Sequence, residues 1–110
     1  TRSSIPTPVN RAVGFLESAF TEEITNPMLA VVAGLSLRTF LRRFKAATGM
    51  SPQQYLLRIR VARACHLLRE TTDSITDIAF NTGFTDSNYF SRKFSDVTGL
   101  PPSRYRRKQH

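Results

Sequence analysis

The chain has 110 residues, enough for one compact unit or for two small subdomains that share a helix. Sixteen Lys and Arg residues against eight Asp and Glu residues give a formal net charge of +8, which favours an anionic partner such as nucleic acid or a membrane surface. The single cysteine excludes a framework of internal disulfides and suits the reducing cytoplasm, and no apolar run approaches the ~20 residues of a transmembrane helix.

The positive charge is unevenly distributed along the chain. No Lys or Arg occurs between Ala12 and Leu37, whereas fourteen of the sixteen lie from Arg38 onward. We therefore expect a scaffold in the first 37 residues and a charge-bearing surface after them. Residues 1–9 are rich in Ser, Thr and Pro, as linkers are, and are interpreted as a linker tail within a longer protein.

Helical periodicity and capping residues predict three helices in the first half of the chain. The first carries an apolar stripe of Ala12, Val13, Leu16, Ala19 and Phe20. The second is capped by residue 25 or 26 and ends at Gly34; the third is capped by Ser36, runs to about residue 48 and ends at Gly49.

Four more helices are predicted in the second half, and no segment alternates with the period of a strand. A long fourth helix runs from Pro52 to about residue 69 and is expected to bury Tyr55, Leu56, Ile59, Ala62 and Leu67 or Leu68. A capping-box pattern at Ser74 and Asp77 opens a fifth helix over residues 75–81. Thr85 or Asp86 caps a sixth that runs to about residue 97, and a short seventh carries Tyr105.

Part of the sequence occurs twice. Residues 40–55, FLRRFKAATGMSPQQY, correspond to residues 90–105, FSRKFSDVTGLPPSRY, with seven of sixteen positions identical. Ahead of each copy lies a matching segment at an offset of 49 residues, in which Leu29-Ala30-x-x-x-Gly34-Leu35-Ser36 pairs with Ile78-Ala79-x-x-x-Gly83-Phe84-Thr85. A short helix with a small residue, a glycine turn and a capped second helix form a helix-turn-helix pattern, which is present twice.

The second helix of each motif has an apolar side and an outward side. Phe40, Phe44 and Ala47 are expected to point inward on the third helix, and Phe90, Phe94 and Val97 on the sixth. The outward side chains are Arg38, Leu41, Arg42 and Lys45 on the third helix, and Ser87, Asn88, Ser91 and Arg92 on the sixth. Arg and Asn can each bond the edge of a base with two hydrogen bonds.

The length of the fourth helix suggests how both motifs could meet one duplex. About 18 residues at ~1.5 Å per residue span roughly 27 Å. With the width of the flanking subdomains, the two outward helices would lie roughly one DNA turn, ~34 Å, apart. One chain could then contact two successive segments of the major groove.

Taken together, these motifs resemble the DNA-binding domain of the AraC/XylS family of bacterial transcription regulators, over about residues 10–107. The resemblance depends on the two helix-turn-helix segments, Phe40-x-Arg42-x-Phe44, Thr48-Gly49-x-Ser51-Pro52-x-x-Tyr55, Arg60-x-x-x-Ala64-x-x-Leu67-Leu68, Tyr89-Phe90-Ser91-Arg92-x-Phe94 and Thr98-Gly99-x-x-Pro102-x-x-Tyr105. It implies an all-α fold of seven helices, in which two helix-turn-helix subdomains (residues 10–50 and 71–110) are joined by a linker helix (residues 51–70).

The resemblance also implies function. Sequence-specific binding of double-stranded DNA is expected, with base contacts from Arg38, Leu41, Arg42, Ser87, Asn88, Ser91 and Arg92. Leu41 stands where a polar reader is common in the family. We expect phosphate contacts from Ser36, Arg43, Lys45, Thr85 and Lys93.

Family members usually join this domain to an effector-binding or dimerisation domain, so such a domain is expected beside this one. Membership favours activation over repression of transcription, a choice that the sequence leaves open, and RNA polymerase is an expected partner. The run from Ser36 to Phe44 resembles members fused to an amidase-like DJ-1/PfpI-type domain. No metal or cofactor is expected.

Three alternatives compete with DNA binding. An enzyme is disfavoured because Cys65, His66 and His110 form no catalytic or metal-binding pattern. A basic helical module that docks on a protein or a membrane surface would need a broad exposed apolar face, whereas here two cores account for the apolar residues. RNA binding is weaker, since the deep and narrow major groove of RNA does not admit a helix.

Overall fold

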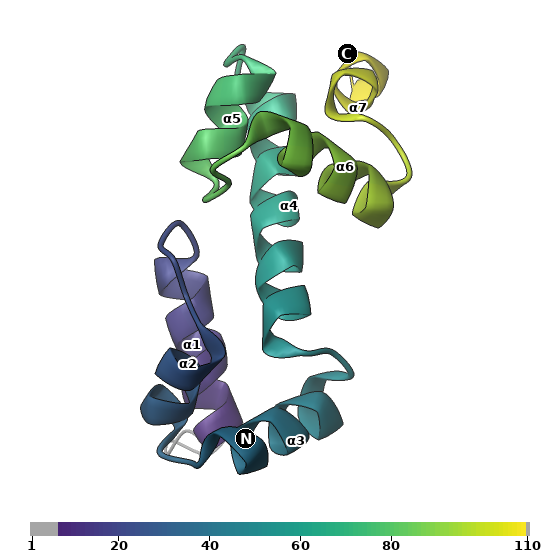
Figure 1. Ribbon diagram of the computed structural model, residues 1–110. Helices are drawn as coiled ribbons and strands as arrows, with labels where there is room; N and C mark the ends of the chain where they lie inside the picture. The colour runs from purple at the N-terminus through teal and green to yellow at the C-terminus, as the bar shows by residue number, and fades with distance from the viewer. Residues whose placement is uncertain (1–6, 110) are drawn as a thin grey trace, which may run out of the picture. The chain divides into compact units, whose positions relative to one another are not determined.

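The computed structural model describes residues 7–109, and within them the chain forms seven α-helices and no strand (Figure 1). The all-α, seven-helix prediction is therefore confirmed. The helices are α1 (Pro8–Ala19), α2 (Asn26–Ala33), α3 (Leu37–Thr48), α4 (Pro52–Glu70), α5 (Ile75–Asn81), α6 (Ser87–Thr98) and α7 (Pro102–Gln109). The chain divides into two compact units, residues 1–56 (unit 1) and 57–110 (unit 2).

The first helix begins slightly earlier than the sequence predicts. Thr7 is its N-cap and accepts a hydrogen bond from the N–H of Asn10 at 3.1 Å, so Pro8 and Val9 belong to α1 although the sequence placed them in the linker tail. Residues 1–6 of that tail lie outside the described residues, as does His110.

The predicted caps hold at most other helix starts. Thr25 caps α2 and Ser36 caps α3. Ser74 accepts the N–H of Asp77 at 3.0 Å and caps α5. At the start of α4 there is a reciprocal capping box that we did not predict, in which the Gln54 N–H donates to Ser51 Oγ at 3.2 Å and the Ser51 N–H donates to Gln54 Oε1 at 2.9 Å.

The cap of α6 locates the extra residue of the second repeat. The Asp86 carboxylate accepts the N–H groups of Asn88 and Tyr89 at 2.8 and 3.2 Å, so Asp86 is the cap and not Thr85. Asp86 thus corresponds to Ser36, whereas the sequence had paired Ser36 with Thr85. The inserted residue therefore lies between the glycine turn and the cap of α6.

The core of unit 1 is formed mainly by α1, α2 and α3, which pack against one another (Figure 1). The predicted inward phenylalanines Phe40 and Phe44 are completely buried, and so is Leu16 of α1. Ala47, which we predicted to be buried, is exposed: α3 buries only the two phenylalanines, and in its last turn Thr48 is the residue that faces the protein. Among the described residues, the buried apolar side chains of unit 1 are those of Ala12, Leu16, Ile24, Leu29, Ala30, Ala33, Phe40, Phe44, Pro52 and Leu56.

The core of unit 2 is formed by residues of the C-terminal half of α4, of α5 and of α6, together with Phe84 of the turn between α5 and α6. Its buried residues are Val61, Ala64, Leu68, Ile78, Ala79, Phe84, Phe90 and Phe94. The prediction that Ala62 is buried was wrong, because the buried residues of this half of α4 recur at i, i+3 and i+7 from Val61. The predicted line of buried residues, which starts at Tyr55 and continues along one side of α4, therefore does not include Val61 or Ala64.

The sequence repeat is also a repeat of contacts. The rings of Phe44 and Tyr55 meet edge to face at 5.5 Å, and those of Phe94 and Tyr105 do so at 5.4 Å. Helices α3 and α6 each end at a glycine with positive φ, 77° at Gly49 and 84° at Gly99, where a residue with a β-carbon would be strained. The same residues thus build the same local structure twice.

Candidate nucleic-acid interface

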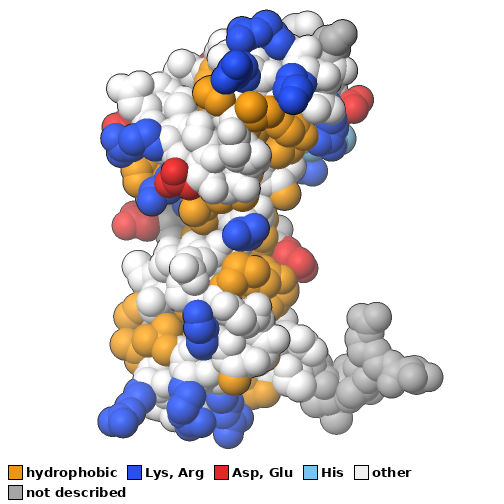
Figure 2. Space-filling model, turned by 90° about the vertical axis from the view of Figure 1, so that its right-hand side faces the viewer, with side chains coloured by type: hydrophobic (Ala, Val, Ile, Leu, Met, Phe, Trp, Pro, Cys, Tyr) orange, Lys and Arg blue, Asp and Glu red, His pale blue; other side chains and the backbone are white. Residues whose placement is uncertain are grey.

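The outward side of α3 presents four cations to solvent. Its sequence alternates inward phenylalanines with basic residues at helical spacing, so the burial of Phe40 and Phe44 turns the basic residues outward. The exposed cations are Arg38, Arg42, Arg43 and Lys45. In Figure 2, Lys and Arg side chains gather at the lower edge of unit 1, where α3 lies in Figure 1.

Leu41 and Ser36 complete the set predicted on α3. Leu41 is half-buried beside the exposed arginines, so an apolar side chain forms part of this surface. Ser36 is exposed, and its Oγ accepts the N–H of Thr39 at 3.3 Å. This bond caps the helix. It occupies one acceptor site of the Ser36 hydroxyl and leaves the O–H of that hydroxyl able to donate to another group.

The outward side of α6 is more mixed in composition. Asn88 and Arg92 are exposed, while Ser87, Ser91 and Lys93 are half-buried. Thr85 is exposed in the turn before the helix. All the residues that the sequence proposed for DNA contact are thus accessible, and each unit brings its own set together on one helix and the residues just before it.

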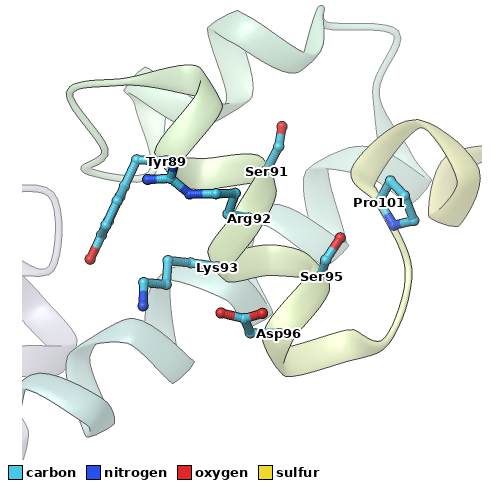
Figure 3. Close-up of a pocket in the computed structure, with 7 residues that line it drawn as sticks. All are labelled: Tyr89, Ser91, Arg92, Lys93, Ser95, Asp96 and Pro101. Atoms are coloured by element: carbon cyan, nitrogen blue, oxygen red, sulfur yellow. The ribbon is translucent and has the colours of Figure 1, made fainter.

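Tyr89 is the residue of this surface that the sequence prediction missed. Its side chain is 43% exposed, and the Arg92 guanidinium and the Lys93 ammonium lie 5.8 and 5.6 Å from the centre of its ring. Figure 3 shows these side chains around a shallow hollow on unit 2 that Ser91, Ser95, Asp96 and Pro101 also line. The spacing i, i+3 and i+4 of an aromatic and two cations was the available signal.

Several other cations hold the fold together and are not part of either outward helix face. The Arg11 guanidinium donates to the carbonyl oxygens of Val32 and Ala33 at 3.3 and 2.7 Å, at the end of α2. Arg106 donates in the same way to Leu68 and Thr71 at 3.2 and 3.1 Å, at the end of α4. Such bonds satisfy carbonyl groups that a helix leaves without partners.

Arg60 is a partly buried cation of unit 2. It lies 5.9 Å from the centre of the Phe84 ring. Burial lowers the pKa of the Arg60 guanidinium, and the charge of Tyr89 opposes this shift. Because an arginine starts from a very high pKa, Arg60 remains charged at neutral pH.

Residues 7–109 offer no cluster of three or more His, Cys, Asp or Glu side chains that could bind a metal ion. Cys65 is half-buried and packs against the core of unit 2, and His66 is exposed on α4. Among the described helices, none has the length and apolar character needed to span a bilayer.

The sequence is similar to known transcription regulators. The helix-turn-helix domain family matches residues 29–108. The HTH-type transcriptional activator RhaS of Enterobacter sp. (strain 638) is 49% identical over 86 residues, which cover 78% of this chain and 31% of that protein. RhaS of Escherichia fergusonii is 44% identical over 98 residues, covering 89% of this chain and 35% of that protein. The chain thus spans about a third of the length of these curated relatives.

The fold is also similar to solved structures. The DNA-binding domain of AdpA, the global transcriptional factor, was crystallised with a target DNA; its TM-score is 0.87 at 31% identity, over 93% of this chain and 92% of that one. The C-terminal domain of AraT, a response regulator from Geobacillus stearothermophilus, has a TM-score of 0.89 at 30% identity, over 96% of this chain and 88% of that one. The chain therefore belongs to the AraC/XylS family of bacterial transcription regulators, in which it corresponds to the helix-turn-helix DNA-binding domain.

Proposed function

We propose that α3 and α6 are recognition helices that read bases in two neighbouring major-groove segments of one DNA duplex. The observation that carries the proposal is the equivalent pair Arg42 and Arg92. Every other identical position of the sixteen-residue repeat is a core aromatic, a turn residue or a buried proline, whereas these two arginines are exposed. The fold does not require an arginine at this position, yet both copies have one. This indicates that the two DNA segments share a feature that the arginine contacts.

The remaining outward residues fit distinct roles. Arginine can bond O6 and N7 of guanine with two hydrogen bonds, which suits Arg38, Arg42 and Arg92, and Asn88 can bond adenine in the same manner. The hydroxyl groups of Ser87 and Ser91 can form hydrogen bonds with more than one kind of base. Leu41 can contact only an apolar group, such as the methyl of thymine.

The phosphate contacts flank these positions. Arg43 and Lys45 on α3, and Lys93 on α6, are cations beside the proposed readers. Ser36 and Thr85 precede the two helices, where hydroxyl groups commonly bond phosphate oxygens. Such contacts orient each helix on the duplex and carry no base preference.

The length of the linker helix supports the proposal that one chain contacts two adjacent segments of the major groove. Helix α4 has 19 residues, which at ~1.5 Å per residue corresponds to about 28 Å. We propose that residues 10–50 and 71–110 act as two DNA-contacting subdomains, that residues 51–70 are the linker helix that joins them, and that each subdomain meets its own major-groove segment. A footprint that covers two major-groove segments on one face is expected for the monomer. Protection of one segment alone contradicts this part of the proposal.

The relatives suggest the wider role. RhaS proteins are transcriptional activators, and this chain spans about a third of their length. We propose that the chain acts as the DNA-binding part of a cytoplasmic activator, joined to an effector-binding or dimerisation domain, that contacts RNA polymerase. It is a binding module rather than an enzyme.

Selection of bound duplexes from a random pool tests the base contacts. Arg42→Ala and Arg92→Ala should each cost about 1–3 kcal/mol at a cognate site and relax the preference at one base pair. Arg63→Ala, which removes an exposed cation from α4, serves as the matched control and should leave the base profile unchanged. An unchanged profile in both recognition-helix variants would refute base reading by this pair.

Salt dependence tests the phosphate contacts. The logarithm of the affinity should fall by ~0.9 for each phosphate contact per unit of log salt. Lys45→Ala should reduce that slope by about one contact without changing the base profile. A flat response to salt, together with binding to anionic vesicles that survives high salt, would favour a membrane-surface module instead.

A further inference from the structure

One aromatic ring on α6 contacts two cations of the proposed DNA surface. The centre of the Tyr89 ring lies 5.8 Å from the Arg92 guanidinium carbon and 5.6 Å from Lys93 Nζ. In Figure 3 both side chains extend toward Tyr89, whereas Ser91 points away from it. Both distances fall within the range of attraction between a cation and a ring face.

The ring itself is held by the core of unit 2. It packs against Phe84 at 6.3 Å between ring centres, and Phe84 is only 4% exposed. Phe84 in turn meets Phe90 edge to face at 5.0 Å. Tyr89 is therefore partly exposed on one side and supported by buried aromatic residues on the other, which limits its motion.

The first repeat lacks this arrangement. The residues that correspond to Tyr89, Arg92 and Lys93 are Thr39, Arg42 and Arg43. Threonine has no ring, and within residues 7–109 the Arg42 guanidinium takes part in no hydrogen bond or ion pair. The two recognition helices thus share an arginine but differ in what holds it.

We propose that Tyr89 is a positioning residue that pre-orders Arg92 and Lys93 for DNA, so that α6 discriminates its base pair more sharply than α3 discriminates the equivalent one. The proposal depends on the proposed base reading by Arg92. Arginine and lysine side chains lose considerable rotamer freedom when they are fixed in a complex. A ring that already restricts them lowers this loss on binding.

The direction of the contact also suits DNA reading. Side chains on a helix lean toward its N-terminus, and here Arg92 and Lys93 reach one turn back to Tyr89. In helix-turn-helix proteins the N-terminal part of the recognition helix contacts the base edges. Tyr89 therefore holds both cations toward the end of α6 that enters the groove.

The test separates the ring from the rest of the side chain. Tyr89→Phe keeps the ring, whereas Tyr89→Leu keeps an apolar side chain against Phe84 but removes the ring. Thr39→Leu is the matched control at the equivalent position of α3. For each variant, affinity for the selected duplex, the base profile and the urea midpoint of unfolding are measured on the 110-residue chain.

Tyr89→Leu should weaken binding by about two- to five-fold, the range that an exposed cation–π contact supports, and should relax preference at the Arg92 base pair only. Tyr89→Phe should stay close to the wild type in both respects. Removing Arg92 as well should cost less in the Tyr89→Leu background than in the wild type, because the two residues act through one contact. Thr39→Leu should leave the preference at both arginine positions unchanged.

Two results overturn the inference. One is a Tyr89→Leu variant that folds normally and keeps the wild-type base profile. The other is a Tyr89→Phe variant that loses as much as Tyr89→Leu, which would assign the effect to the phenol hydroxyl. Both are distinguishable from failure of the proposed function, in which Arg92→Ala itself leaves base preference unchanged.

Discussion

The hydroxyl group of Thr98 should contribute measurably to the stability of unit 2. Its Oγ1 lies 2.9 Å from the carbonyl oxygen of Phe94 and accepts the N–H of Leu100 at 3.2 Å, in a partly buried turn. Thr98→Val replaces the hydroxyl with a methyl group of similar size, so the Leu100 N–H loses its acceptor. Leaving such a group without a partner costs about 1–3 kcal/mol of unfolding free energy.

The repeat supplies the matched comparison. Thr48 makes the equivalent contacts in unit 1, at 2.9 Å to the Phe44 carbonyl oxygen and 3.1 Å from the Met50 N–H. Thr48→Val should therefore destabilise by a similar amount, while serine at either position keeps the hydroxyl and most of the stability. Urea unfolding followed by circular dichroism measures these differences. Valine variants that unfold at the same urea concentration as the serine variants would refute the reasoning.

Three further substitutions test how the helix ends are held. Asp86→Ala should cost about 1 kcal/mol because the first turn of α6 loses its cap, and Asp86→Asn should restore most of it in the same urea assay. Arg106→Ala should cost about 1–2 kcal/mol by freeing carbonyl groups at the end of α4, whereas Arg104→Ala, on an exposed part of α7, should change stability by less than about 0.5 kcal/mol. Gly99→Ala should cost about 1 kcal/mol and so lower the thermal midpoint, through its backbone torsion alone. Apart from its two chain neighbours, no described residue has a heavy atom within 4 Å of an added β-carbon. An unchanged midpoint contradicts this.

The helices could be predicted from the sequence because local signals agreed with one another. Phe40 and Phe44 set the inward side of α3, and Ser36 and Gly49 set its ends. The repeat added independent support, since a second copy with the same spacing is not expected by chance. Where a position was small and apolar, as at Ala62, the pattern alone could not decide between core and surface, because alanine is tolerated at both.

The roles of the cations were harder to predict. Arg11 and Arg106 are basic residues like those on α3, but they bind carbonyl groups 21 to 38 positions away along the chain. Only tertiary packing brings those groups within reach, so the count of positive charges overstates the number available to DNA. The pairing of Tyr89 with two cations likewise depends on side-chain rotamers that sequence spacing permits but does not determine.

The repeat separates what the fold needs from what the ligand needs. Positions that are identical in both copies hold the aromatic core and the turns, apart from Arg42 and Arg92. The neighbouring outward positions differ, with Arg38 against Asn88 and Leu41 against Ser91. If these residues read bases, the two half-sites of the operator should share one G·C pair and differ at neighbouring base pairs. A selected operator made of two identical half-sites would therefore contradict base reading by the positions that differ, while a shared guanine in unlike surroundings is what this surface requires.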